Sequence, residues 1–239
     1  MRILITNDDG IHSPTLKGLV EWAASLGEVT VVAPRDEQSG KSQSIDFRHP
    51  LEIKSVALPF AHRAYTVSST PADCVRFAIL GLDIGYDLVI SGVNLGYNLG
   101  HDIAYSGTVA ASLEAARLGI KSLAFSAHQS LSFDDYKSVL SSVFDYVMKR
   151  NLLGFANVYN INLVTSPKDI LITAQGGVYY TDRFEHIGGD TYVQDGEPYR
   201  SPTPDLSYDT DAVWEGYVSV TPMTFEKTDL SALNALKRL

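Results

Sequence analysis

The chain opens with Met1-Arg2-Ile3-Leu4-Ile5-Thr6-Asn7-Asp8-Asp9-Gly10. This stretch decides the class of fold. Its first half is short, apolar and β-branched, which is typical of a strand buried on both faces of a parallel sheet. Ser13-Pro14 then supplies an N-cap and a first-turn proline, so a helix is expected to begin there. Asp8 and Asp9 are therefore expected at the carboxyl end of a parallel strand, where open α/β sheets bind ligands.

Two adjacent carboxylates in such a place repel each other unless a cation lies between them. A hard divalent metal is the cation that carboxylate oxygens prefer. The alternative is that one of Asp8 and Asp9 shapes an Asx turn while the other is merely solvated. The contiguous pair favours the metal, because a turn needs only one aspartate.

Composition narrows the class of partner. The chain has 239 residues and a formal net charge of -9, which argues against a nucleic-acid polymer and leaves room for a small anionic ligand. The single Cys74 excludes an intrachain disulfide. No apolar run approaches the about 18 residues that cross a membrane, and the first strand begins without a signal-like segment. A cytoplasmic protein without membrane contact is expected.

The remainder of the first two thirds alternates strands with helices. Strands are expected at residues 29–33, 51–56, 64–67, 87–91 and 122–126, and helices at 71–82, 106–118 and 133–149. This alternation, continuing to about residue 162, predicts an α/β fold with a doubly wound, mainly parallel sheet.

The last third has a different pattern. Residues 170–200 are aromatic-rich and alternating, with glycines at 176–177 and 188–189, which predicts a β-hairpin arm. A strand at 216–220 and a short terminal helix at 229–239 follow. Residues 1–239 are expected to form one domain, whose extension from about 170 to 239 packs on another subunit, because a lone hairpin buries little of its own surface.

Two further loops carry oxygen donors at the ends of predicted strands. Gln38-Ser39-Gly40 offers a hydroxyl, and the glycine-rich loop over residues 91–100 offers the amide oxygens of Asn94 and Asn98. With the two carboxylates these donors form an all-oxygen set, which suits magnesium, manganese or calcium better than zinc. No Cys-His ligand pattern competes with this set.

The same loop leads into Ser106-Gly107-Thr108, where a helix is expected to begin. Free backbone N–H groups and two hydroxyls at a helix N-terminus form an anion site, above all for phosphate. The alternative is that Ser106 is only an N-cap. Neither a Walker A sequence nor a dinucleotide-binding glycine pattern is present, so a nucleotide cofactor is disfavoured.

Several long motifs together resemble the SurE family of stationary-phase survival proteins, in order along nearly the whole chain. They are Asn7-Asp8-Asp9-Gly10, Val32-Ala33-Pro34 with Gln38-Ser39-Gly40, Thr70-Pro71-Ala72-Asp73, Ser91-Gly92-Val93-Asn94, Tyr105-Ser106-Gly107-Thr108-Val109, and Gly216-Tyr217-Val218-Ser219-Val220. The resemblance implies a Rossmann-like fold with C-terminal arms exchanged in homodimers or homotetramers. It also implies a metal-dependent 5′-nucleotidase that hydrolyses nucleoside monophosphates, with 3′-nucleotidase and exopolyphosphatase activity in some members.

Carried over by motif, one divalent ion per subunit, magnesium or manganese, would be held by Asp8, Asp9, Ser39 and Asn94. The phosphate of the substrate would then be bound by Asn98, Ser106, Gly107 and Thr108. A metal-activated water would attack phosphorus, with Asp8 and Asp9 as the catalytic residues. Two alternatives remain: a non-catalytic nucleotide or phosphate sensor, and a haloacid-dehalogenase-like phosphatase with an aspartyl-phosphate intermediate, which typically needs Asp-x-Asp.

Overall fold

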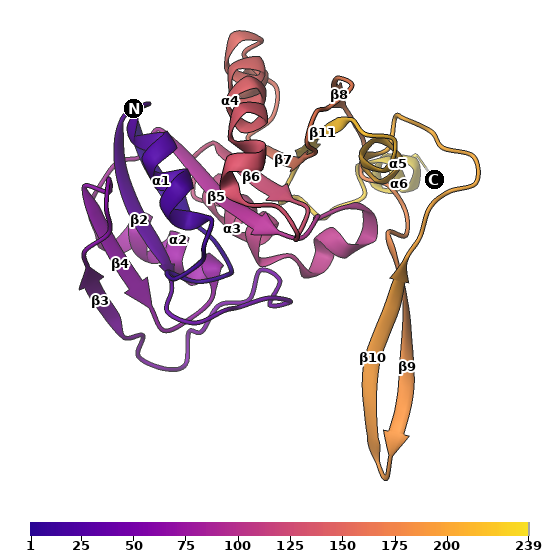
Figure 1. Cartoon of the computed structure of the whole chain (residues 1–239), viewed down its shortest axis with the longest axis horizontal. Helices are drawn as coiled ribbons and strands as arrows, with labels where there is room; N and C mark the ends of the chain where they lie inside the picture. Colours follow the sequence, from indigo (N-terminus) through magenta and orange to yellow (C-terminus); the bar gives the residue numbers. More distant parts are fainter. Residues whose placement is uncertain (239) are drawn as a thin grey trace.

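The computed structural model describes residues 1–238 and contains a nine-stranded sheet covered by helices, with a separate two-stranded hairpin projecting from it (Figure 1). The order of the strands in the sheet is β3-β4-β2-β1-β5-β6-β7-β11-β8. Their bounds are β1 Arg2–Thr6, β2 Glu28–Pro34, β3 Ile53–Val56, β4 Arg63–Val67, β5 Leu88–Leu95, β6 Ser122–Ala127, β7 Val158–Leu163, β8 Ile170–Ile172 and β11 Val218–Met223. The predicted α/β class is confirmed.

Strand β1 lies at the point where the sheet reverses its direction of growth. It pairs in parallel with both β2 and β5. From β1 the chain builds outward through β2 to β4, then returns to β5 and builds the other way through β6 and β7, all in parallel. Antiparallel pairs occur towards the margins, at β3–β4 and β7–β11. The carboxyl ends of β1 and β5 thus form a topological switch point, where such sheets bind ligands.

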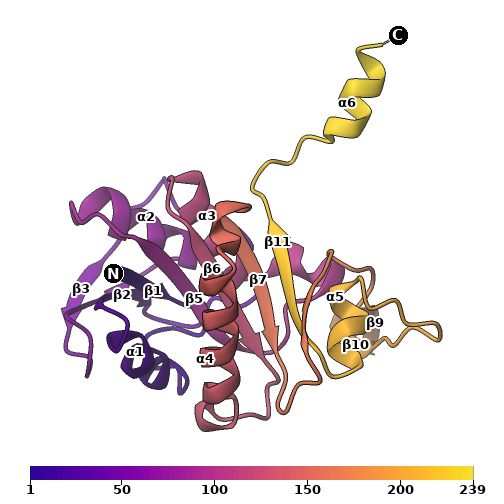
Figure 2. The same cartoon turned by 90° about the horizontal axis from the view of Figure 1, so that it is seen from above.

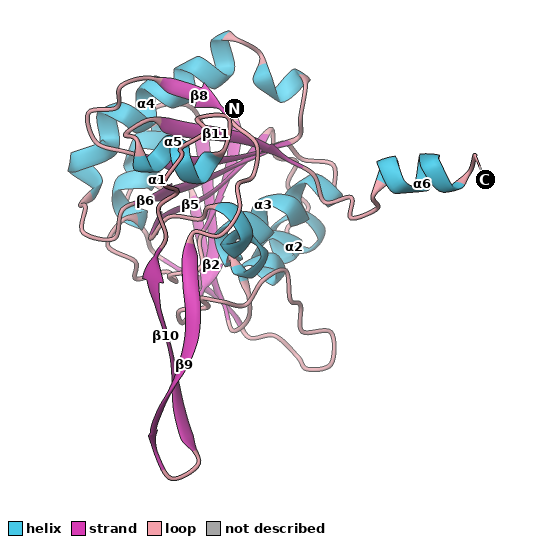
Figure 3. Ribbon diagram, turned by 90° about the vertical axis from the view of Figure 1, so that its right-hand side faces the viewer, coloured by secondary structure: helices cyan, strands magenta, loops and turns pink. Residues whose placement is uncertain are grey.

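Helices cover both faces of the sheet (Figure 3). On one face α1 (Leu16–Ala24) and α4 (Phe133–Lys149) pack on the strands, and on the other α2 (Pro71–Gly81) and α3 (Gly107–Arg117) do so. One face of α4 is apolar at helical spacing and is buried, with Leu140, Val143 and Val147 fully covered. Thr70 caps α2, because its side chain accepts from the Asp73 N–H.

Two local predictions are wrong near the switch point. A loop is predicted from Gly92, but β5 continues to Leu95 with an irregular register between Ser91 and Asn94. Gly92 permits this because a Cβ there would lie 2.2 Å from the Phe125 carbonyl oxygen. Ser13 does not cap α1. Its hydroxyl pairs with the Thr15 hydroxyl at 3.0 Å, and Thr15 donates to the Val93 carbonyl at 2.9 Å, so these hydroxyls fasten the turn to β5.

The last third divides between the body and two projections. Strands β8 and β11 join the main sheet, with α5 (Asp209–Trp214) packed against β11. The hairpin of β9 (Tyr180–Gly188) and β10 (Thr191–Pro198) projects, as predicted. Helix α6 (Leu230–Leu236) extends away from the body with no buried side chain (Figure 2). The helix was predicted to reach Leu239, which lies outside the described residues. Among residues 1–238 no helix is long and apolar enough to cross a membrane.

Candidate active site

The predicted metal ligands lie on segments that meet at the switch point. Asp8 and Asp9 follow β1, and Asn94 lies near the end of the adjacent strand β5. The segment after β2, which carries Ser39, is fixed to the same place because the Gln38 N–H donates to the Asp8 carbonyl at 2.8 Å. Residues from three separate parts of the sequence are therefore gathered at one edge of the sheet.

A buried asparagine shapes the turn that carries the two aspartates. The Asn7 amide nitrogen donates to the Gly10 carbonyl at 2.9 Å, and the Gly10 N–H donates to the Asn7 side-chain oxygen at 3.1 Å. Gly10 has a φ of +90°, which glycine adopts without strain. Asn7 was not among the predicted site residues, although its spacing from Gly10 is the signal of a side-chain-closed turn. With Asn7 closing the turn, neither aspartate is needed for that purpose.

The Asp8 carboxylate lies against the start of α3. It is 4% exposed and accepts a short hydrogen bond from the Thr108 hydroxyl. A Cβ on Gly107 would lie 2.8 Å from the Asp8 Cβ, so only glycine permits this approach. Burial raises the pKa of Asp8, and the hydroxyl and backbone N–H of Thr108 oppose that rise. The Thr108 hydroxyl, predicted to bind phosphate, thus holds Asp8 in this structure.

Asp9 carries an uncompensated negative charge. Its Oδ2 atom is buried and has no hydrogen-bond partner among the described residues. Burial, then the carboxylates of Asp8 and Glu37, raise the pKa of Asp9 to about 6. None of these three acids forms an ion pair with a lysine, arginine or histidine in the described part of the chain. An orphaned carboxylate oxygen beside two like charges fits a divalent cation held by oxygen donors.

The two neutral candidate ligands are oriented by neighbours. The Asn94 amide nitrogen donates to the Gly96 carbonyl at 2.8 Å, which leaves the side-chain oxygen as the ligating atom. The exposed Ser39 hydroxyl donates to Glu37 at 2.7 Å, so its lone pairs remain open to a cation. Glu37 was not predicted from the sequence, because a charged loop residue without a spacing pattern gives no signal.

The predicted phosphate residues occupy two settings. Ser106 caps α3 by accepting from the Val109 N–H at 3.1 Å, and it keeps its own proton for donation. Asn98 lies in a buried polar network, where its amide nitrogen donates to Ser126 and its carbonyl accepts from Asn160 and Asn162. Among residues 1–238 no hydrogen bond joins Asn98 to the 106–108 segment. Asn98 therefore fixes the loop after β5 in this structure.

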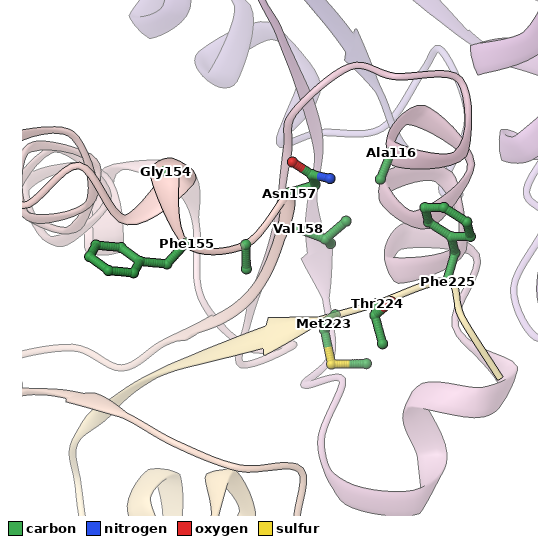
Figure 4. A pocket seen from close by; sticks show the side chains of 9 residues that line it. Ala116, Gly154, Phe155, Asn157, Val158, Met223, Thr224 and Phe225 are labelled. Carbon is green, nitrogen blue, oxygen red and sulfur yellow. The ribbon is translucent and has the colours of Figure 1, made fainter. Parts of the chain in front are cut away.

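A different cavity, of about 270 Å³, opens at the opposite edge of the sheet (Figure 4). It is lined by the end of α3, the segment before β7 and the end of β11, and Figure 4 shows Phe225 beside Ala116 of α3. Its lining contains no acid, base or thiol. This cavity therefore offers no group for acid–base or nucleophilic catalysis, whereas the switch point carries two carboxylates.

The whole chain is similar to proteins of one family. A family model described as "Survival protein SurE" matches residues 3–182. The chain is 42% identical to "5'-nucleotidase SurE 1" of Thermus thermophilus, over 100% of this chain and 98% of that protein. It is 41% identical to "5'-nucleotidase SurE" of Desulfitobacterium hafniense, over 100% of this chain and 96% of that protein. The crystal structure of the SurE protein from Aquifex aeolicus has a TM-score of 0.84 at 33% identity, covering 100% and 99% of the two chains. This chain therefore belongs to the SurE family of survival proteins.

Proposed function

We propose that this protein is a divalent-metal-dependent 5′-nucleotidase that hydrolyses nucleoside 5′-monophosphates to nucleoside and phosphate. The observation that carries the proposal is the buried, unpartnered Asp9 Oδ2 beside Asp8 and Glu37. A site with this charge repels a phosphate unless a cation is bound. The substrate class is supported by relatives named 5′-nucleotidase at 42% and 41% identity over the whole chain.

One magnesium or manganese ion would be held by Asp8, Asp9, Ser39 and Asn94. When bound, it would supply positive charge at the phosphate oxygens and lower the pKa of the attacking water. The donor set is made of oxygens alone, as these ions prefer.

The residues of the chain would position the phosphate and the carboxylates. The free N–H groups at the start of α3, with the Ser106 hydroxyl, would hold the phosphate oxygens and stabilise their charge as the bond to the leaving oxygen breaks. Thr108 would keep Asp8 in one orientation through its hydroxyl and backbone N–H. Asn98 would contribute indirectly, because it holds the loop after β5 in place. The proposal extends to 3′-nucleotides and short polyphosphate, because both also present a terminal anionic phosphoryl group.

We propose in addition that the protein works as a homodimer or homotetramer. Large apolar side chains are exposed along both projections, with Phe184 and Ile187 on the hairpin and Leu230 and Leu236 on α6 each more than 60% exposed. Exposed apolar surface of this kind is typical of an interface. A second copy of the chain would cover it.

The test is phosphate release from a panel of 5′- and 3′-nucleoside monophosphates and short polyphosphate. It is measured with chelator, and again after magnesium or manganese is restored in excess. We expect release only with the metal, and none from Asp9→Asn, while Asp36→Asn in the neighbouring loop stays active. Undiminished release in chelator would rule out the metal dependence, and no release from any substrate with any metal would favour the sensor alternative.

A further inference from the structure

A second cavity, of about 250 Å³, opens at the same edge of the sheet as the candidate active site. Its walls come from four parts of the chain: the end of β5, the short helix η1 (Gly100–Tyr105), the segment after β6, and the base of the hairpin with α5. The lining residues used below are Gly96, Tyr97, Asp102, His128, Gln129, Tyr179 and Trp214.

The cavity adjoins the candidate metal ligand Asn94. Its wall residue Gly96 accepts a hydrogen bond from the Asn94 side chain at 2.8 Å. The Gly96 N–H donates to the Ala127 carbonyl at 2.8 Å, and Ala127 precedes the wall residue His128. A ligand whose phosphate lies at the switch point can therefore place its other end in this cavity.

Two pairs of aromatic rings line the cavity. The rings of Tyr97 and His128 are 5.8 Å apart between centroids, with an angle of 67° between their planes. Those of Tyr179 and Trp214 are 5.7 Å apart at 35°. Such rings offer flat apolar surface to a planar heterocycle, on which base stacking contributes favourably.

Polar groups without partners face the same space. The hydroxyls of Tyr97 and Tyr179, the Asp102 carboxylate and the Gln129 amide form no hydrogen bond within residues 1–238. Burial raises the pKa of Tyr97 and of Tyr179 to about 12, so both are neutral O–H donors. Tyr97 and Asp102 also raise the pKa of Tyr179 electrostatically, which places these groups close together. Tyr97, Asp102 and Tyr179 are half-buried, and polar groups in such a place are costly to leave unpaired unless a ligand pairs them, whereas Gln129 is exposed.

We propose that this cavity binds the base of the nucleotide substrate and favours guanine, an inference that rests on the proposed nucleotidase activity. An ionised carboxylate only accepts hydrogen bonds, and its two oxygens can accept two at once. Guanine presents two adjacent N–H donors on one edge, whereas adenine, cytosine and uracil place an acceptor next to their donor. Asp102 therefore accepts hydrogen bonds from these two N–H groups of guanine, while the guanine ring stacks against Tyr97 and Trp214.

The first test uses the protein without metal and nucleosides without phosphate. Trp214 lines the cavity, and the only other tryptophan of the sequence, Trp22, is buried against Phe144. We expect guanosine to quench the emission saturably, and Trp214→Phe to abolish that response. Asp102→Asn should weaken guanosine binding about tenfold or more, as for a lost hydrogen bond to a charged group, and leave adenosine unaffected. Asp182→Asn is the matched control, because it removes a neighbouring carboxylate that does not line the cavity.

The second test separates this inference from the proposed function. With metal present, Asp102→Asn should lower kcat/KM for guanosine monophosphate about tenfold or more relative to adenosine monophosphate. Hydrolysis of ribose 5-phosphate, which has no base, should be unchanged. An equal fall for all three substrates, or no guanosine quenching in the wild type, would overturn the base-reading role. If wild type releases no phosphate from any of the three, the proposed function fails, while the quenching result still decides the inference.

Discussion

The substitution Asp9→Asn should stabilise the metal-free protein while it abolishes activity. The pKa of Asp9 is raised from 3.8 to about 6 by burial and then by Asp8 and Glu37. Folding therefore pushes an ionised carboxylate into a place that disfavours its charge. An asparagine fills the same space without that charge, but it removes one anionic ligand for the metal.

The expected gain follows from this pKa. Each pKa unit corresponds to about 1.4 kcal/mol, so keeping Asp9 ionised at pH 7 costs about 3 kcal/mol at most. Solvent screens part of this cost. The Leu95 backbone and the Ser13 side chain lower the pKa of Asp9, and an amide interacts with them less favourably than a carboxylate, which removes about 1 kcal/mol more. A net gain of about 1–2 kcal/mol remains, which is about 2–8 °C in Tm for a chain of this length.

The pH dependence gives an independent check of the sign. The penalty is absent below the unfolded pKa of 3.8 and complete above the folded pKa of about 6. The stability advantage of Asp9→Asn over wild type should therefore grow as the pH rises from about 4 to about 6. Thermal unfolding in chelator, followed by circular dichroism at about pH 4.5 and pH 7, measures it.

A matched control is Asp36→Asn. Asp36 forms an exposed ion pair with Arg35 at 2.9 Å on the same loop as Glu37, so its loss should change the unfolding free energy by less than about 1 kcal/mol. The reasoning is refuted if Asp9→Asn melts below wild type at pH 7 in chelator, or if its advantage is the same at both pH values.

Three further outcomes are expected. Ser106→Ala should lower the free energy of unfolding by about 1 kcal/mol through loss of the α3 cap and raise KM, with metal affinity by calorimetry unchanged; Ser142→Ala, exposed on α4, is the control. Glu114→Ala should lower the free energy of unfolding in urea by about 2–4 kcal/mol, because Arg76 loses its buried partner; a loss under about 1 kcal/mol would contradict this. Replacing residues 181–197 by a short glycine-serine turn should lower the oligomeric order in light scattering, whereas a wild-type monomer at micromolar concentration would contradict the oligomer proposal.

The parts of the fold that the sequence predicts are those that depend on local patterns. The strand after Met1 and the helix over residues 133–149 follow from apolar runs of the right period; both are present, and the helix has the predicted bounds. The path of β5 beyond Ser91 was missed because Gly92 and Asn94 are typical of loops. Only the Phe125 carbonyl of the neighbouring strand requires a glycine there.

The candidate site was partly predictable for a related reason. Strand ends at one edge of a parallel sheet come together whatever the loops do, so Asp8, Asp9 and Asn94 could be placed near one another from sequence. The residues that contact each of these side chains could not be predicted from the sequence. Thr108 lies 100 residues from Asp8, whose carboxylate it contacts, and Glu37 is recognisable only once the loop after β2 is folded against β1. Such contacts depend on tertiary packing, which the spacing of apolar residues in the sequence does not predict.

Buried acids elsewhere in the molecule show why the setting of Asp9 points to function. Glu114 is also buried, but hydrogen bonds from Arg117, Arg76 and Gln43 outweigh the effect of burial and lower its pKa. Burial raises the pKa of Asp209, yet its carboxylate accepts from the Gly176, Gly100 and Thr210 N–H groups.

A raised pKa alone therefore does not distinguish a ligand site from a structural carboxylate. Within the described residues Asp9 supplies the only carboxylate oxygen that is buried without any partner. Native proteins rarely leave such a group unpaired, because a buried polar atom without a partner lowers the free energy of unfolding. The fold tolerates this cost at the switch point, beside two further acids, and no other described carboxylate has a fully buried oxygen without a partner. A cation that binds there would remove the cost and provide the charge that a phosphate requires, so the same unpaired oxygen accounts for both the expected loss of stability without metal and the proposed activity.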